Sequence, residues 1–313
     1  MLDLTKLAQQ MQGISQHLAE EATASRQRLE LAQRLLTQAQ SRQAELVSQR
    51  QTWNDRLGFA AAEPVEPLTT RVDLKVAPAI HTAIATDGSQ IAPSHHEIAY
   101  CYLINVGRVV LHYGQSLHPL LDSLPEVFYR PEDLYVSRQW GIRTEEWMGY
   151  RRTVSEATVL ADLACQVKEG QRDEGEQKDE VGRMYASGVP EGWDEEERRN
   201  KELEDRVPLL AMVDGSLIYW FLEALPNEAR DRLLPEILQA WEQLRLAKIP
   251  LIGYLSASRS GEALNFLRLQ TCPHPAPDCA THCPGQSDRA PCHVFDPLRD
   301  IALWSAFLEP GQR

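Results

Sequence analysis

The chain has 313 residues, of which 43% are hydrophobic and 25% are charged, and its formal net charge is −13 at pH 7. That length allows one large domain or two ordinary ones, and the hydrophobic share is enough for a packed core. The acidic charge argues against a simple basic nucleic-acid coat protein. No apolar run reaches the ~18 residues of a membrane span and the N-terminus lacks a secretory signal pattern, so we expect a cytoplasmic protein without membrane insertion.

Residues 1–58 are expected to form one long helix, since residues 1–57 contain no proline and a single glycine, Gly13. One apolar stripe predicts packing against the rest of the domain, whereas a second stripe that begins at Leu7 and fails at Glu21 leaves an imperfect coiled coil open. In the second case two copies of the chain associate through this helix. The stripe repeats every seven residues at Leu4, Met11, Leu18, Ala32, Ala39, Leu46 and Trp53.

Residues 59–76 form a linker, in which two prolines prevent the helix from continuing. The stretch "IHTAIATDGSQI" follows and is interpreted as a strand, a tight turn and further strand. Residues 98–114 hold two apolar runs separated by Asn105, Val106 and Gly107, a pattern that predicts a β-hairpin. We therefore expect the first strands to be antiparallel neighbours.

The second half of the chain predicts an α/β layer. Residues 144–167 form a helix with one apolar face, and residues 168–206 carry 14 acidic and 8 basic residues, which predicts a solvated or disordered insert. The nearly continuous apolar run 207–222 suits a central strand covered on both faces. A helix over 230–249 and a strand over 250–260 follow, and this order implies a parallel pair of strands.

The tripeptide Asp-Gly-Ser occurs twice, at 87–89 and at 214–216, where buried strands are expected to end. A carboxylate at such a position is costly unless its charge is compensated, and two of them on adjacent strands repel each other. A Mg²⁺ or Mn²⁺ ion relieves both costs and activates water for attack on a phosphate. The alternative is structural, because Asp-Gly is a common turn dipeptide.

The order of these motifs resembles the NurA nuclease domain. The resemblance rests on the first Asp-Gly-Ser, an Arg-rich helix with a Glu, "VDGSLI" and "IGYLSASRS", and it covers residues 77–313 apart from the acidic insert and a cysteine-rich segment. It implies an RNase H-like mixed sheet flanked by helices. It also implies Mn²⁺-dependent cleavage of DNA, as a 5′→3′ exonuclease and single-strand endonuclease in end processing and repair, by a homodimer beside a HerA-like hexameric translocase.

By position, the resemblance makes Asp87 and Asp214 metal ligands and assigns the helical acid between them to Glu156. The alternative for Glu156 is an ion pair with Arg152, four residues earlier. Tyr254, Ser256 and Arg259 follow the next strand, where a phosphate contact and a structural role are both open.

The sequence departs from the family pattern at its C-terminus, because the family continues after "LEPGQR" to a late active-site His and this sequence stops at Arg313. His95 and His96 are expected at the surface. The sequence is therefore expected to be a fragment or a chain that has lost the end of its sheet. The alternative function is a non-catalytic adaptor of the same fold that acts through its helix and acidic segment.

A second departure is residues 272–293, which hold Cys272, Cys279, Cys283 and Cys292. Proline and glycine fill the gaps and little is apolar, so metal binding is what could order this loop. Four thiolates suit Zn²⁺ or a [4Fe–4S] cluster, with His274, His282 or His293 able to replace one of them. Four free thiols in a surface loop and a redox-sensing module are the alternatives.

Residues 128–152 are the candidate path for single-stranded DNA, because arginines pair with phosphates and aromatic rings stack on unpaired bases. Nearby acidic residues nearly cancel this charge, and aromatic residues at helical spacing are also typical of a core. The arginines are Arg130, Arg138, Arg143, Arg151 and Arg152, and the aromatic residues are Tyr129, Tyr135, Trp140, Trp147 and Tyr150.

Overall fold

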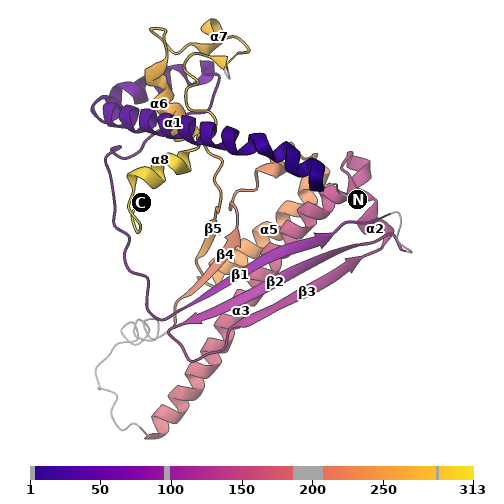
Figure 1. Ribbon diagram of the computed structural model, residues 1–313. Helices are drawn as coiled ribbons and strands as arrows, with labels where there is room; N and C mark the ends of the chain where they lie inside the picture. The colour runs from indigo at the N-terminus through magenta and orange to yellow at the C-terminus, as the bar shows by residue number, and fades with distance from the viewer. Residues whose placement is uncertain (1–3, 95–98, 186–206, 287–288) are drawn as a thin grey trace. The chain divides into compact units, whose positions relative to one another are not determined.

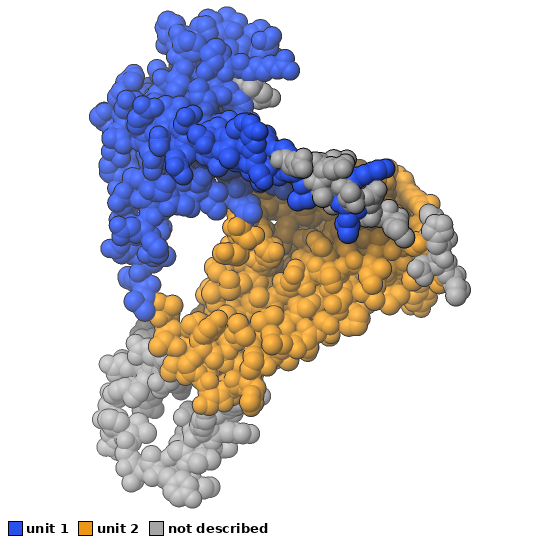
Figure 2. Space-filling model, viewed as in Figure 1, with its two compact units in different colours: residues 1–76, 257–313 blue, residues 77–256 orange. Residues whose placement is uncertain are grey.

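The computed structural model describes residues 4–94, 99–185, 207–286 and 289–313. The chain divides into two compact units, which Figure 2 colours separately. Unit 1 combines Met1–Val76 with Ala257–Arg313, and unit 2 is the contiguous stretch Ala77–Ser256. The two ends of the chain thus build one unit, and the middle builds the other.

Unit 2 is built on a five-stranded mixed sheet with the strand order β3-β2-β1-β4-β5 (Figure 1). β1 is antiparallel to β2 and parallel to β4, β2 is antiparallel to β3, and β4 is parallel to β5. This arrangement confirms the expected α/β fold with an RNase H-like mixed sheet. The strands are β1 His81–Ile91, β2 Tyr102–Tyr113, β3 Leu120–Phe128, β4 Leu209–Asp214 and β5 Leu251–Tyr254.

Two local predictions for the first strands are wrong. Residues 98–114 form no hairpin, because Tyr102, Ile104 and Val106 are buried in strict alternation and this period of two continues through the expected turn. The first Asp-Gly-Ser is not a turn either, since β1 runs through it and pairs Asp87 with Gly107 of β2. The expectation that the first strands are antiparallel neighbours is confirmed by the long strands β1 and β2.

Two helices, α3 Thr144–Tyr185 and α5 Asn227–Leu246, pack on one face of the sheet (Figure 1). α3 extends past the expected end at residue 167, because residues 168–185 are rich in Glu, Gln, Lys and Arg, which favour helix. The remaining residues of the acidic insert, 186–206, lie outside the described residues. The core under the two helices includes Ile84, Ala211, Val213, Leu160, Ala161 and Leu244, all buried.

Within the apolar run 207–222 the strand β4 ends at Asp214, where the second Asp-Gly-Ser was expected to end it, and the apolar residues that follow are not strand. After Asp214 the chain turns away from the sheet and forms the short helix η3 Trp220–Ala224. Leu222 and Leu225 anchor that helix in a second apolar cluster with Trp147 of α3 and Leu233 of α5. The short helices α2 Pro131–Leu134 and η2 Val136–Trp140 complete unit 2.

In unit 1, the helix α1 Leu4–Trp53 packs the second half of its apolar stripe within its own chain. Ala32, Ala39 and Leu46 are fully buried in a cluster that includes Leu267 and Leu303. The stripe residues of the first half, Leu4, Met11 and Leu18, are 68%, 53% and 60% exposed. No helix in the described residues has the length and apolarity of a membrane span.

The remainder of unit 1 is short helices joined by long loops, η1 Asn54–Arg56, α6 Glu262–Arg268, η4 Leu269–Thr271, α7 Cys279–His282 and α8 Asp300–Phe307. Asp300 holds two of them together, because its carboxylate accepts hydrogen bonds from the backbone N–H groups of Ala263 and Leu264 at the start of α6. The hydroxyl of Ser260 donates to the same carboxylate over 2.7 Å.

Candidate active site

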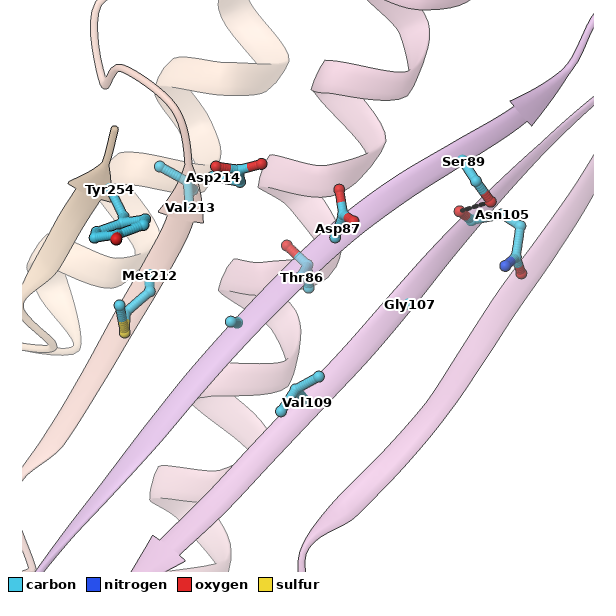
Figure 3. Close-up of a pocket in the computed structure, with 11 residues that line it drawn as sticks. Thr86, Asp87, Ser89, Asn105, Gly107, Val109, Met212, Val213, Asp214 and Tyr254 are labelled. Carbon is cyan, nitrogen blue, oxygen red and sulfur yellow. Dashed lines mark hydrogen bonds between the residues drawn. The ribbon is translucent and has the colours of Figure 1, made fainter. Parts of the chain in front are cut away.

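Asp87 and Asp214 lie on neighbouring strands at the same level of the sheet. The parallel register of β1 and β4 ends with the pair Thr86–Val213, and each Asp is the next residue in its strand. Figure 3 shows the carboxyl group of Asp214 extending from β4 toward Asp87 on β1. Both side chains line a cavity of about 450 Å³, together with Asn105 of β2 and Tyr254 of β5.

The alternation of strand residues explains why these acids reach the cavity. Thr86 and Val213 are buried on the face covered by helices, so Asp87 and Asp214, the next residue in each strand, point the other way. The hydroxyl of Thr86 donates to the backbone carbonyl of Glu156 over 3.0 Å, which fixes α3 against β1 at this level.

Glu156 brings a third carboxyl group to the same level of the sheet from the helix-covered face, because α3 packs directly over Gly88. A Cβ atom at position 88 would lie 2.2 Å from Oε1 of Glu156, so only glycine leaves room for this carboxylate. Burial is the main cause that raises the pKa of Glu156, and the charges of Asp87 and Asp214 raise it further. The Arg152 guanidinium and the backbone N–H of Gly88 act in the opposite direction.

The ion pair considered for Glu156 is present, with Nε of Arg152 3.2 Å from Oε1 of Glu156. It does not remove Glu156 from the acidic cluster, since the same carboxyl group senses Asp87 and Asp214. We call Asp87, Glu156 and Asp214 the carboxylate cluster. The three acids come from β1, α3 and β4, that is, from three elements far apart in the sequence.

The carboxylate cluster has the donor chemistry of a site for a divalent cation, although the acids are not already drawn together around one. In the part of the chain that the structure describes, no three His, Cys, Asp or Glu side chains are grouped closely enough to hold a metal. Hard cations such as Mn²⁺ and Mg²⁺ take carboxylate oxygens as ligands. A bound cation would offset the negative charges of Asp87 and Asp214 that help to raise the pKa of Glu156.

A second cavity, of about 260 Å³, lies on the helix side of the same cluster. Asp214 and Thr86 line both cavities, and Arg152 and Glu156 line the second. Its lining also includes Ile218, Tyr219, Trp220 and Phe221, which belong to the apolar run 207–222 that the sequence analysis interpreted as a strand. The sequence could not have identified these residues as cavity-lining, because an apolar run looks the same whether its side chains are buried or exposed. In the structure Ile218 and Trp220 are exposed.

The arginines predicted to bind DNA are not gathered in one place. Arg152 lines the second cavity, whereas Arg151 forms an ion pair of 2.9 Å with Glu236 of α5. The guanidinium of Arg138 lies over the ring of Tyr135, and Arg143 is exposed before α3.

The residues expected to follow the next strand are also separated. Tyr254 pairs with Asp214 and lines the first cavity, and Ser256 is exposed at the end of unit 2. Arg259 belongs to unit 1. His95 and His96 lie outside the described residues.

In unit 1, the four clustered cysteines are all free thiols, with Cys279 and Cys292 buried and Cys272 and Cys283 half-buried. They are close enough to interact, because burial, followed by the charges of the other three thiols, raises the pKa of Cys272. Nε–H of Arg268, which is itself buried, donates to Sγ of Cys292 over 3.2 Å.

The loop that carries these cysteines is tied to the end of the long helix. Asp278 caps α7 by accepting from the backbone N–H of Thr281. Arg56 of η1 pairs with the same Asp278 carboxylate at 2.7 Å. The rings of His274 and His282 stack with their centroids 4.1 Å apart.

Comparison with known proteins adds one finding. The family model described as the NurA domain matches residues 81–313, from the first residue of β1 to the last residue of the sequence. No curated protein and no solved structure matches the chain.

Proposed function

The chain belongs to the NurA domain family of nucleases, and on this premise we propose that it is a metal-dependent deoxyribonuclease whose centre is the carboxylate cluster. The observation that supports the proposal is that Asp87 and Asp214 lie at one level of neighbouring strands, with Glu156 of α3 near enough for their charges to raise its pKa. Acids on adjacent strands form a rigid scaffold for a cation, since the sheet fixes their spacing.

Asp87, Asp214 and Glu156 would hold Mn²⁺ or Mg²⁺. Such an ion supplies charge neutralisation at the phosphate and a water activated for attack. The chain's own groups then orient the substrate. Nε of Arg152 lies 3.2 Å from Glu156, and the guanidinium of this cavity-lining residue carries further N–H donors that can bind a phosphate oxygen.

Glu156 is the member of the cluster suited to take up a proton. Because its pKa is raised, Glu156 without a bound metal holds a proton more readily than an exposed Glu does. A group in that condition transfers protons near neutral pH more effectively than an ordinary carboxylate. We therefore assign Glu156 both a ligand and a proton-transfer role.

The finer features of the proposal rest on the family. We propose 5′→3′ exonuclease and single-strand endonuclease activity in DNA end processing and repair in the cytoplasm, with a HerA-like hexameric translocase as partner. We also propose a homodimer that pairs the exposed first half of α1, where Leu4, Met11 and Leu18 face solvent. Chemical crosslinking of Met11→Cys chains measures this pairing.

The test is cleavage of labelled single-stranded DNA by the full chain with Mn²⁺, with Mg²⁺ and with EDTA. We expect cleavage with either metal, none with EDTA, and a loss of about a hundredfold or more in both Asp87→Asn and Asp214→Asn. Glu126→Gln, on the remote strand β3, is the control and keeps the wild-type rate. A folded protein that binds the translocase without cleaving DNA would instead support the adaptor alternative.

We propose further that Cys272, Cys279, Cys283 and Cys292 bind one metal centre, Zn²⁺ or a [4Fe–4S] cluster. Four free thiols that interact with one another, on a loop with few apolar side chains of its own, support this proposal. Metal analysis of anaerobically purified protein tests it, with Cys292→Ser as the variant and Cys101→Ser as the control. Folded wild-type protein without zinc or iron would leave the free-thiol alternative.

A further inference from the structure

The segment that follows Asp214 exposes large apolar side chains beside the carboxylate cluster. Ile218 is 58% exposed and Trp220 is 63% exposed, although both belong to an apolar run that continues a buried strand. Leu217, between Ser216 and Ile218, is 38% exposed. Exposed apolar side chains that are neighbours in the chain and lie beside a cavity are candidates for contact with a ligand.

The backbone of this segment is built to present these side chains. The N–H of Gly215 donates to the carbonyl of Tyr254, and the hydroxyl of Ser216 accepts from the N–H of Ile218 over 3.0 Å. On the other side, Leu222 is buried and anchors η3 in the core. The loop is therefore held at both ends, and Trp220 is exposed from a fixed position.

The two aromatic residues that flank Trp220 in the chain, Tyr219 and Phe221, make ring contacts within the protein. Phe221 stacks on Tyr150 of α3 with centroids 4.7 Å apart, and the ring of Tyr219 meets that of Phe221 edge-on. Among the described residues, no ring or cation contact is found for Trp220. Its two neighbours fix the loop, so the Trp220 indole has a face that an incoming ring can cover.

Trp220 lines the same cavity as two acids of the carboxylate cluster. The cavity of about 260 Å³ is lined by Trp220 and Ile218 together with Arg152, Glu156 and Asp214. A nucleotide presents the two matching parts, a phosphate for the cation and guanidinium and a flat base for an aromatic ring. In duplex DNA the base is already stacked and paired. A site that contacts both the phosphate and the face of the base therefore favours an unpaired nucleotide.

We propose that Trp220 is the stacking platform for an unpaired base next to the phosphate held at the carboxylate cluster, so that single-stranded DNA or a frayed end is the preferred substrate. This inference rests on the proposed function for the identity of the ligand. It replaces residues 128–152 as the principal base-contacting segment, because Trp220 is 63% exposed and lines the second cavity, whereas no aromatic residue of 128–152 is among the described residues that line either cavity.

Binding measured without cleavage tests the inference. The anisotropy of a labelled 12-nucleotide oligothymidine is followed with full-length chains in EDTA, beside a blunt duplex of the same length. We expect Trp220→Ala to weaken single-strand binding by about tenfold or more and Trp220→Phe to restore most of it. Duplex binding stays within about twofold, since a paired base does not reach the ring.

Tyr129→Ala is the matched control, because Tyr129 is also 63% exposed in unit 2 but lines neither cavity. We expect it to bind single strands as the wild type does. Equal binding by Trp220→Ala and wild type, or an equal loss in Tyr129→Ala, overturns the inference. Circular dichroism and a melting curve show whether each variant is folded.

The failure of this inference is distinct from failure of the nuclease assignment. If Mn²⁺ supports cleavage but binding ignores Trp220, the platform is wrong and the nuclease stands. If binding depends on Trp220 but no metal supports cleavage, the platform stands in a protein that binds single strands without cutting them. In a protein that does cleave, Trp220→Ala raises KM for single strands about tenfold and leaves kcat within about twofold.

Discussion

The two Asp-Gly-Ser segments have the same sequence and different backbones. The first lies inside β1, where Asp87, Gly88 and Ser89 are paired with successive residues of β2. The second ends β4 at Asp214, and Gly215 has a φ of +113°. The same tripeptide is therefore continuous strand in one place and the start of a loop in the other.

The two glycines are required for different physical reasons. Gly88 needs to lack a side chain, because Glu156 and Arg152 occupy the space that a Cβ atom would take. Gly215 has nothing within 4 Å of an added Cβ but adopts a φ that other residues rarely reach. The two segments therefore share one structural result: each places an aspartate at the same level of the sheet, although the backbone around each aspartate differs.

The largest expected effect tests whether the two aspartates act as one unit. If Asp87 and Asp214 share a cation, the variant Asp87→Asn/Asp214→Asn should be no slower than either single variant, with each about a hundredfold below wild type. Single-turnover rates of DNA cleavage measure this. Multiplication of the two losses, to about ten-thousandfold, would mean that the two acids contribute independently.

The next effect separates the two glycines through activity. Gly88→Ala places a Cβ 2.2 Å from Oε1 of Glu156, so the Glu156 side chain must move and cleavage should fall by about tenfold to a hundredfold. Because side chains rather than backbone give way, the melting temperature should change little. A variant that cleaves at the wild-type rate would contradict the role assigned to Glu156.

Gly215→Ala, unlike Gly88→Ala, should have its main effect on stability. Its cost is the strain of a φ of +113° in a residue with a Cβ, which lowers the free energy of unfolding by about 1–3 kcal/mol. Denaturant titration of both glycine variants gives this comparison. Equal stability of Gly215→Ala and wild type would show that this loop relaxes without cost.

A smaller effect is pH-dependent and concerns the acid between the two segments. The folded state raises the pKa of Glu156 above its ordinary value of 4.5. Its stabilising contribution is therefore complete below that value and is lost as the pH rises through the raised pKa. In EDTA, Glu156→Gln should gain stability relative to wild type as the pH rises from about 4.5 to 7. Melting curves across this range that stay parallel would contradict the expectation.

The smallest effect compares the two serines. The hydroxyl of Ser216 accepts from the N–H of Ile218 over 3.0 Å, so Ser216→Ala should lose about 0.5–1.5 kcal/mol of unfolding free energy. Ser89 is exposed and makes only a 3.5 Å contact with the carbonyl of Asn105, so Ser89→Ala should stay within about 0.5 kcal/mol. A larger loss in Ser89→Ala would reverse this ranking.

Patterns in the sequence were sufficient for the long elements. The proline-free N-terminus predicted α1, and the strand–helix–strand order after residue 207 predicted the parallel pair β4 and β5, because helix and strand periods persist over many residues. The same reasoning failed where a short polar group interrupts an apolar run. Asn105 and Gly107 resemble a turn, yet β1 supplies their partners on the neighbouring strand.

The sequence by itself determined the family and the chemical character of the site, because the acids Asp87, Glu156 and Asp214 stand in motifs whose order is a property of the chain. Only the tertiary structure decided that Gly88 leaves room for Glu156, that Arg151 pairs with Glu236 while Arg152 faces the cavity, and that Trp220 is exposed. Such facts depend on which surfaces meet when the sheet and helices pack. Neighbouring residues on one helix, such as Arg151 and Arg152, are alike in sequence and differ only in what lies opposite them.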